Sequence, residues 1–387
     1  MKAITWFFTT FLIVQGLSAQ PKAYALSGSV SDSATGKPIA AVSVFLNGTS
    51  KGTITHDDGA FLVNGIPAGG YQLIISAVGY ATFQTVINTN QLPTNLNVIL
   101  HRRESELAVV TVKPNIQNGW NKWGRTFWDN FTGTMDNASS CTIENRDVLR
   151  FHYNRKSKRL VVSAAEPLII VNNALGYTVE YRFGAFSYDF SDGVVQFYGF
   201  VFFREMTPTY SGQQRVWESA RQRAYFGSMR HFMRSLYRGR IREEGFLVLH
   251  QVKKPNTEKE RVKAIYNPAI AGTGGISSDS IRHYRKVLRQ PDYFIHTLSN
   301  YDTLLAVQAD GTRSFYFIGV FTVGYSNVQL GIANTSSSME LTSPESLQIE
   351  ENGSYSPLQI LLLRGAWART EAVANLLPSD YTPPPLP

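Results

Sequence analysis

The sequence predicts a mainly β protein with some α structure, in which a small antiparallel β-sandwich precedes a β-rich α+β domain with one long helix. Three observations carry this prediction. Apolar and polar residues alternate through short segments between residues 26 and 100, as in strands that bury one face. Clusters of turn residues separate these segments. The longest stretch with helical periodicity, residues 213–237, lies in the second part.

The first twenty residues have the features of a secretion signal. Lys2 is the only early charge, residues 4–14 form an apolar run, and small residues precede an expected cleavage after Ala19 or Gln20. The run is too short to remain as a spanning helix in the mature protein. We therefore expect export to the periplasm, the outer-membrane periphery or the cell surface, with no integral membrane span in the mature chain.

The composition restricts the stabilising chemistry and the partners. The 387-residue chain has one cysteine, Cys141, and a net charge of +8. A single thiol cannot form an internal disulfide, so apolar cores must stabilise the fold. A basic chain favours anionic partners such as lipid head groups, polysaccharide or an acidic protein of the envelope. We expect no nucleic-acid partner, because the compartment is wrong and no nucleic-acid motif is found in the sequence.

The first domain is expected over residues 21–104. Val42, Val44 and Leu46 illustrate its alternation, since polar Ser43 lies between two of them. Each strand then buries one face and exposes the other. Residues with turn chemistry divide the strands at 32–37, 47–52, 56–59 and 64–70.

Five short pieces of this domain, taken together, carry a resemblance. They are the turn 32–38, the Asn47–Gly48 turn, the turn 57–61, the run 66–69 with Tyr71, and Val78-Gly79-Tyr80. On these pieces the segment resembles the carboxypeptidase-like regulatory domain. The resemblance implies a seven-stranded, transthyretin-like sandwich in an envelope or extracellular setting. It does not imply carboxypeptidase activity, because in that family the module accompanies the enzyme.

Residues 105–117 are expected to form a connecting strand and linker. This segment resembles the junction that follows a similar module in outer-membrane receptors of the TonB-dependent class. The rest of the chain is too short for the plug and barrel of such a receptor. We therefore reject the receptor interpretation, while a receptor-like location stays open.

The second domain is expected over residues 118–382, followed by a Pro-rich tail at 383–387. Ser191-Asp192-Gly193, Asp310-Gly311 and Asn352-Gly353 each separate two apolar runs, which is typical of hairpins. Strands are expected at 141–153, 159–171, 177–190, 193–204, 246–253, 303–308, 314–325, 347–351 and 355–363.

Three shorter helices are expected in this domain, at 118–135, 281–288 and 365–377. The first carries five aromatic side chains at helical spacing. For these aromatics, core packing is favoured over a ligand-binding shelf. They are Trp120, Trp123, Phe127, Trp128 and Phe131.

Two stretches of the second domain, 225–232 and 376–381, carry a further resemblance. They are similar to an uncharacterised domain that follows the sandwich in a group of bacterial envelope proteins. This resemblance implies no mechanism.

The candidate binding residues are Arg223, Arg230, Arg234 and Arg238, which lie along one side of the predicted helix 213–237. Guanidinium groups bind phosphate and carboxylate strongly, so this face is a candidate site for an anionic glycan, lipid or partner. The alternative, which we favour, is a helix face whose charges pair with nearby acids.

Several motifs resemble catalytic signatures without their required context. His101 and Glu104 have the His-x-x-Glu spacing of zinc carboxypeptidases, but the third ligand is missing. Gly48–Gly52 matches Gly-x-Ser-x-Gly, but we expect a hairpin there rather than a strand-to-helix turn. Cys141, with His231 or His152 as base, is better explained as a small buried residue. His231 is better explained as structural, because adjacent arginines disfavour its charged form.

We therefore expect no catalytic residue, no metal site and no cofactor. The leading hypothesis is a non-catalytic secreted or envelope protein, in which the sandwich is a folding or docking module and the second domain binds a partner, glycan or envelope component. Two alternatives stay open. One is a hydrolase with an unrecognised site in the second domain, and the other is an accessory subunit of an outer-membrane complex.

Overall fold

The computed structural model describes residues 23–93, 95–103, 118–266, 277–298, 305–308 and 312–384. The predicted signal segment, the connecting strand at 105–117 and the end of the Pro-rich tail lie outside these residues. The expected domain boundary near residue 104 also stays a prediction. The fold class is confirmed, since strands dominate and a sandwich precedes a β-rich region with several helices.

The sandwich packs a three-stranded sheet, in the order β4-β1-β7, against a four-stranded sheet, in the order β3-β2-β5-β6. Its shared core includes Leu26, Val44, Phe61, Leu73 and Val98. Inward and outward side chains alternate as predicted, for example in β1. The strands are β1 (Tyr24–Asp32), β2 (Ser43–Leu46), β3 (Gly52–Ile54), β4 (Ala60–Ile66), β5 (Gly70–Ser76), β6 (Phe83–Asn88) and β7 (Leu96–Leu100).

One pairing of the sandwich differs from the antiparallel expectation. Strand β7 runs parallel to β1, with Val30 opposite Val98. The cause is the connection from β6, which passes through a short 3-10 turn at Thr89–Gln91 and crosses from one sheet to the other. The strand therefore reaches the edge of the first sheet beside β1 and in its direction.

A buried carboxylate closes the first turn of the sandwich. Asp32 accepts hydrogen bonds from Tyr80 Oη at 2.6 Å and Arg102 Nε at 2.9 Å, and from the main-chain N–H groups of Ala34 and Thr35. These donors favour the charged form and hold the pKa of Asp32 well below its usual value. The turn 32–38 and Tyr80, which were separate pieces of the sequence resemblance, therefore form one unit.

The second region begins with helix α1 (Gly119–Thr132), which covers a six-stranded antiparallel sheet. Phe127 and Phe131 are fully buried and stack on each other at 5.0 Å, and both contact Phe186 of the sheet. The predicted core packing of this aromatic helix is confirmed. The strands are β8 (Cys141–Ile143), β9 (Leu149–Asn154), β10 (Arg159–Ala164), β11 (Leu168–Asn172), β12 (Tyr177–Asp189) and β13 (Val195–Glu205).

A five-stranded sheet, in the order β15-β14-β18-β19-β22, and a small four-stranded sheet, in the order β16-β17-β20-β21, complete the second region. Two of these strands, β15 (Tyr293–Leu298) and β19 (Ile332–Leu341), were not predicted. The others are β14 (Phe246–Pro255), β16 (Leu305–Val307), β17 (Arg313–Phe315), β18 (Val320–Asn327), β20 (Leu347–Ile349), β21 (Tyr355–Ser356) and β22 (Leu361–Gly365).

The stretch predicted as a single helix at 213–237 forms two helices, α2 (Gln213–Tyr225) and α3 (Met229–Arg238). Gly227 separates them with φ +84°, and a Cβ there would lie 2.6 Å from the ring of Tyr325. A left-handed glycine followed by the N-cap of a new helix interrupts the hydrogen-bond ladder. Among the described residues, no helix combines the length and apolarity needed to cross a bilayer.

The closing helix is shorter than the predicted 365–377. Helix α6 (Ala366–Thr370) ends before Glu371, and a 3-10 turn at Val373–Asn375 follows. The carboxylate of Glu371 accepts a hydrogen bond from the main-chain N–H of Met229 at 2.8 Å, and so caps the first turn of α3. This tertiary contact lies just where the observed helix ends.

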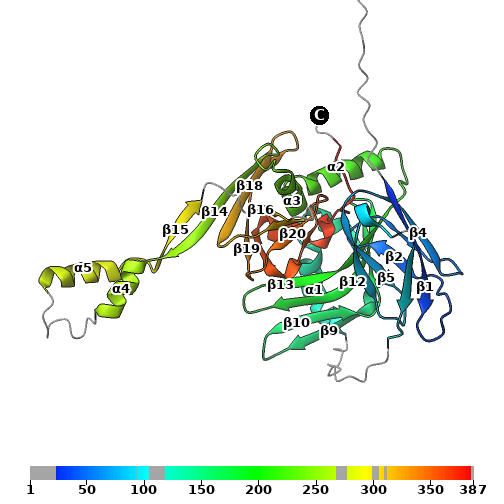
Figure 1. The fold of residues 1–387 in the computed structure, drawn as a ribbon, viewed down its shortest axis with the longest axis horizontal. Helices are drawn as coiled ribbons and strands as arrows, with labels where there is room; N and C mark the ends of the chain where they lie inside the picture. Colours follow the sequence, from blue (N-terminus) through cyan, green and yellow to red (C-terminus); the bar gives the residue numbers. More distant parts are fainter. Residues whose placement is uncertain are drawn as a thin grey trace, which may run out of the picture.

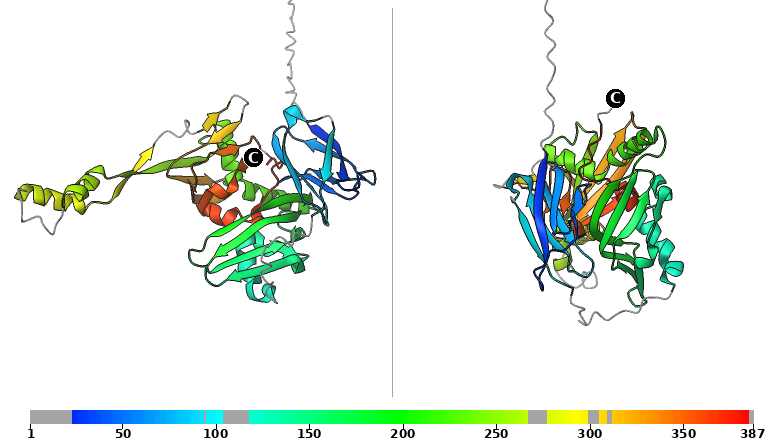
Figure 2. Two further views of the ribbon diagram at one scale, coloured as in Figure 1. Left: turned by 60° about the horizontal axis from the view of Figure 1, so that its bottom comes forward. Right: turned by 90° about the vertical axis from the view of Figure 1, so that its right-hand side faces the viewer.

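An arm projects from this body. It consists of the outer parts of β14 and β15 and of two helices between them, α4 (Thr257–Ile265) and α5 (Ser278–Leu288). Figure 1 and the left view of Figure 2 show both helices at the end of a two-stranded ribbon, far from the sheets. We call the described residues of this segment, 253–266 and 277–295, the arm.

Candidate functional site

The sandwich joins the second region through the β2–β3 turn, Asn47–Lys51, which we call the docking turn. Its main chain lies beside the C-terminal half of β13. Gly48 N donates to Val201 O at 2.7 Å, and Phe203 N donates to Thr49 O at 3.0 Å. Main-chain bonds of this kind fix the register of one segment on another without depending on side-chain type.

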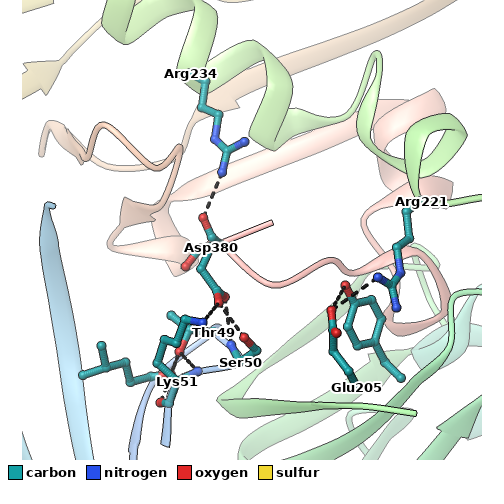
Figure 3. A network of polar contacts seen from close by, with 10 residues as sticks. Thr49, Ser50, Lys51, Glu205, Arg221, Arg234 and Asp380 are labelled. Atoms are coloured by element: carbon teal, nitrogen blue, oxygen red, sulfur yellow. Dashed lines mark hydrogen bonds and ion pairs between the residues drawn. The ribbon is translucent and has the colours of Figure 1, made fainter. Parts of the chain in front are cut away.

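The other side of the docking turn faces the C-terminal segment of the chain (Figure 3). Ser379 N donates to Gly48 O at 2.7 Å. The carboxylate of Asp380 accepts from Ser50 N at 2.8 Å and from Ser50 Oγ at 2.5 Å, and it pairs with Lys51 Nζ at 3.5 Å. The side chain of Asp380 is only 6% exposed, so these contacts replace most of its hydration. The turn is therefore held between two segments of the second region.

An apolar contact accompanies these hydrogen bonds. Phe45 and Ile74, on the outer face of the second sandwich sheet, form a buried cluster with Phe202. The rings of Phe45 and Phe202 lie 5.3 Å apart, and the guanidinium of Arg182 covers Phe45. A Cβ on Gly52 would approach Phe202 to 2.7 Å. The close approach explains why a glycine directly follows the docking turn.

Arg234 of α3 holds the C-terminal segment from the opposite side. It is 5% exposed. Its Nε donates to Asn352 O at 2.9 Å, and its Nη2 donates to Ser379 O at 2.8 Å and Tyr381 O at 3.0 Å. One buried guanidinium therefore satisfies three main-chain carbonyls and positions Asp380 toward the docking turn (Figure 3).

A second buried arginine fixes α2 to the six-stranded sheet. Arg221 is 3% exposed and lies over the ring of Tyr177. Its Nε donates to Leu175 O at 2.8 Å, while its Nη1 pairs with Glu205 at 3.3 Å. This cluster is separate from the contacts of Asp380 in Figure 3. Both arginines act as hydrogen-bond hubs inside the second region.

The four predicted binding arginines do not share one surface. Arg223, which donates to Ser219 Oγ, and Arg238 are exposed, on α2 and α3 respectively. Arg230 is half-buried, and desolvation lowers its pKa to about 10. Arg234 is buried among the carbonyls described above. The anion-binding interpretation of the four stays a prediction, and only Arg223 and Arg238 present their charge to solvent.

The cysteine is buried and inert in this environment. Cys141 is 6% exposed, and its Sγ donates weakly to Asn137 O at 3.4 Å. Burial raises the pKa of the thiol to about 12. The nucleophilic form is the thiolate, so the group stays protonated and unreactive near neutral pH.

The histidine on α3 has a structural position. His231 is 3% exposed, and desolvation by burial lowers its pKa. Gly227 N donates to Nδ1 at 3.1 Å, which leaves Nε2–H to donate to Glu244 at 3.1 Å. Both ring nitrogens are therefore occupied, as expected for a neutral structural histidine.

The structure also shows where His101 and the Gly-x-Ser-x-Gly match lie. His101 is exposed, and Glu104 lies outside the described residues. Arg102 between them caps the carboxylate of Asp32. Residues 48–52, which match Gly-x-Ser-x-Gly, belong to the docking turn and the start of β3. In the described ranges, no three His, Cys, Asp or Glu side chains are arranged to hold a metal ion.

One shallow hollow lies beside α1. Its volume is about 270 Å³, and its lining includes Trp120, Arg146, Asp147 and Arg150. The guanidinium of Arg146 lies over the ring of Trp120 at 5.8 Å. The hollow is open to solvent and brings together none of the residues singled out as catalytic candidates.

Sequence reasoning missed Asp380, the buried role of Arg221 and the docking role of the Asn47–Gly48 turn. Two signals bore on them. Asp380 lies inside the stretch 376–381 that resembled an uncharacterised domain, and Asn47–Gly48 was one of the five pieces of the sandwich resemblance. Each signal marked a position, but neither indicated that the two positions meet.

Comparison with known proteins supports the resemblance stated for the first domain. Residues 26–112, about a fifth of the chain, match the family model of the CarboxypepD_reg-like domain. No curated protein matches the chain.

Several solved structures show a weak likeness. An N-terminal interface mutant of a type II cohesin–X-dockerin complex from Acetivibrio cellulolyticus is 19% identical, with a TM-score of 0.18, over 20% of this chain and 57% of that chain. In a second mutant of that complex, the match covers 56% of the length of that chain. The chain thus spans little more than half the length of these two.

Two further structures are matched along most of their length. A putative membrane-associated protein of unknown function from Bacteroides fragilis is 12% identical, with a TM-score of 0.18, over 89% of this chain and 97% of that chain. BcpA, the major pilin subunit of Bacillus cereus, is 10% identical, with a TM-score of 0.16, over 86% and 96%. At such identities and TM-scores, none of these likenesses carries an argument about this chain. The family match and the seven-stranded sandwich agree with each other, and the N-terminal domain is therefore a CarboxypepD_reg-like domain.

Proposed function

We propose that this protein is a non-catalytic binding protein of the cell envelope. In this proposal the sandwich is an intramolecular docking module, and the second region presents the arm to a partner. The observation that carries the proposal is the arm itself, which extends from the body as a two-stranded ribbon tipped by two helices (Figures 1 and 2).

The arm has little core of its own. Val262, Tyr266 and Val287 are its buried cluster, with three partly buried neighbours. A two-stranded ribbon is marginally stable in water, and ordering each residue costs about 1–2 kcal/mol of conformational entropy. A partner that covers the arm would add the apolar burial that this segment lacks. Such a projecting element is suited to reaching a partner.

The contacts of the sandwich support a docking role. The docking turn is held by main-chain bonds to β13 and by Asp380, while Phe45 and Ile74 pack on Phe202. The sandwich thereby covers an apolar surface of the second region. This arrangement fixes the body from which the arm projects.

Two of the groups considered for the hydrolase alternative do not favour it. The thiol of Cys141 is buried with a pKa raised to about 12, and both ring nitrogens of His231 are engaged in hydrogen bonds. An accessory role in an outer-membrane complex is compatible with a binding arm. The identity of the partners recovered with the protein would distinguish this accessory role from the leading proposal.

Removing the arm tests the proposal. Lys253 and Ile295 face each other in the β14–β15 ladder, so residues 254–294 can be replaced by an Asn-Gly turn. We expect the variant to melt as the full protein does but to lose its recovery with envelope fractions and its cross-linked partners.

The matched control replaces the exposed β9–β10 turn, residues 155–157, by the same dipeptide. It should keep both recovery and cross-links. Full envelope recovery of the armless variant, with unchanged cross-links, would overturn the proposal.

A further inference from the structure

We infer that the arm binds an anionic lipid surface, with α5 facing the head groups and β15 entering the boundary below them. The inference rests on the proposed function and names the partner of the same arm. The strongest observation is its charge. The arm contains nine Lys and Arg residues and four Asp and Glu residues, a net charge of +5, out of +8 for the whole chain.

The charge is concentrated on one face of α5. Arg282, Arg285, Lys286 and Arg289 follow one another at spacings of three, one and three residues, and all four are exposed. The opposite face of the helix contributes the buried Val287 to the contact with α4. A helix that buries one face against its neighbour necessarily presents this cationic face outward.

Three of the four acidic residues of the arm form ion pairs, and only one of these pairs involves the cationic face. Asp292 pairs with Lys259 and Lys263, and Glu258 pairs with Arg261. Asp279 pairs with Arg282 at 3.4 Å, between two strongly exposed side chains. The other three cations of the face are Arg285, Lys286 and Arg289. Within the part of the chain that the structure describes, none of these three forms an ion pair with an acidic side chain.

Apolar side chains are exposed beside this charge. Tyr293 is 45% exposed, Phe294 is 44% exposed and Ile295 is 62% exposed. Three consecutive strand residues point alternately to the two faces of the ribbon, so apolar surface is exposed on both faces there. Lys253 lies over the ring of Tyr293 at 4.8 Å. Charged and apolar groups thus meet where α5 ends and β15 begins.

This combination selects among anionic partners. A second copy of the arm would bring like charges together, which disfavours pairing. An anionic glycan would engage the cations but would leave Phe294 and Ile295 in water. A lipid surface satisfies both, because phosphate head groups attract Lys and Arg while aromatic and aliphatic side chains enter the interface.

Vesicle co-sedimentation of the purified full chain tests the inference. The probes are vesicles of phosphatidylcholine alone and of phosphatidylcholine mixed with phosphatidylglycerol. We expect binding to the anionic vesicles only, weakened by added salt. The variant Arg285→Gln/Lys286→Gln/Arg289→Gln should lose roughly a hundredfold in partitioning, at about a fivefold loss for each cation near the surface.

The matched control is Arg155→Gln/Lys156→Gln/Lys158→Gln, which removes the same charge from the exposed β9–β10 turn of the body. It should change partitioning only slightly. A second variant, Tyr293→Ser/Ile295→Ser, should also weaken binding and make the residual binding more sensitive to salt. Thermal melting checks that each variant is folded.

Three results would overturn the inference: no binding of the full chain to anionic vesicles, equal losses in both triple variants, or unchanged binding of the serine variant. The last would indicate purely electrostatic attachment, as to a glycan. Loss of envelope recovery on arm deletion without vesicle binding would leave the proposed function standing with another partner. Vesicle binding with normal recovery of the armless variant would instead reject the proposed function.

Discussion

The docking turn and the arm are both polar, basic segments between strands, yet their surroundings differ completely. In the turn, Gly48, Thr49 and Ser50 each have partners in the second region, and Lys51 pairs with Asp380. In the arm, the cations of α5 and three consecutive residues of β15 face solvent. Composition alone therefore does not distinguish a structural contact from an exposed surface. The two are distinguished by whether their polar groups have partners within the protein.

The arginines repeat this contrast. Arg234 on α3 donates to three main-chain carbonyls and is buried, whereas Arg285 on α5 has the same chemistry but is exposed. Neutralising the first should cost folding free energy, because the carbonyls lose a charged donor. Neutralising the second should cost only binding. Four comparisons of a buried group with an exposed control test this contrast, in order of decreasing effect on stability.

The largest effect is expected in the core of the sandwich. Phe61 is 2% exposed and belongs to the core shared by both sheets, so Phe61→Ala should cost about 3–5 kcal/mol. Urea unfolding of the isolated fragment 21–104 measures this, because we expect the sandwich to fold without the docking contacts. The neighbouring Leu62 is 49% exposed and gives the control Leu62→Ala. A non-cooperative transition of the unmodified fragment would contradict the independence of the sandwich.

The next effect concerns the hub of the C-terminal segment. Arg234→Met should cost about 2–4 kcal/mol, because the buried carbonyls of Asn352, Ser379 and Tyr381 lose their donor. Arg238→Met, one turn later on the exposed side of α3, should stay within about 0.5 kcal/mol. Denaturant unfolding of the full chain compares the two. Equal costs would mean that α3 has no privileged arginine, and the distinction drawn above would fail.

The sequence predicted those elements whose pattern is local. Val42, Val44 and Leu46 alternate within a few residues, and Ser191-Asp192-Gly193 supplies a turn between two apolar runs. In contrast, β19 is rich in serine and threonine, and only Ser337 and Met339 along it are buried. Its strand conformation comes from pairing with β18 on one side and β22 on the other, which a single-segment pattern does not contain.

The same limit applies to the break between α2 and α3 and to the docking site. A glycine is tolerated in helices, so Gly227 alone did not predict a break. The ring of Tyr325, almost a hundred positions further along the chain, fills the space that a side chain there would occupy. Ser50 and Asp380 are separated by 330 positions. Nothing in either local sequence indicates that the hydroxyl of one is held by the carboxylate of the other.

A smaller effect is expected for the single pair that ties the docking turn to the C-terminal segment. In a double-mutant cycle of Ser50→Ala and Asp380→Asn, we expect a coupling free energy of about 1–2 kcal/mol, because the 2.5 Å hydrogen bond to a charged acceptor is largely buried. The exposed pair Arg364–Glu340 is the control, and its coupling should be about 0–1 kcal/mol. A coupling at Asp380 no larger than this would mean that the main-chain bonds and the Phe45–Phe202 contact alone attach the sandwich to the second region.

The smallest effect on global stability should come from the arm. Val262 is fully buried in its small cluster, so Val262→Ala should remove about 1–3 kcal/mol of local stability and speed amide hydrogen exchange in α4 and α5. Among the described residues, the ribbon joins this cluster to the body (Figure 1), so the global unfolding midpoint should remain unchanged, as expected for a locally unfolding unit. Ile265→Ala, at a site 53% exposed on the same helix, should alter neither measurement. If Val262→Ala instead lowered the global midpoint while exchange in the arm and body rose together, the two would unfold as one unit. The arm would then be an extension of the body rather than a separately ordered binding element, and its contrast with the docking turn would disappear.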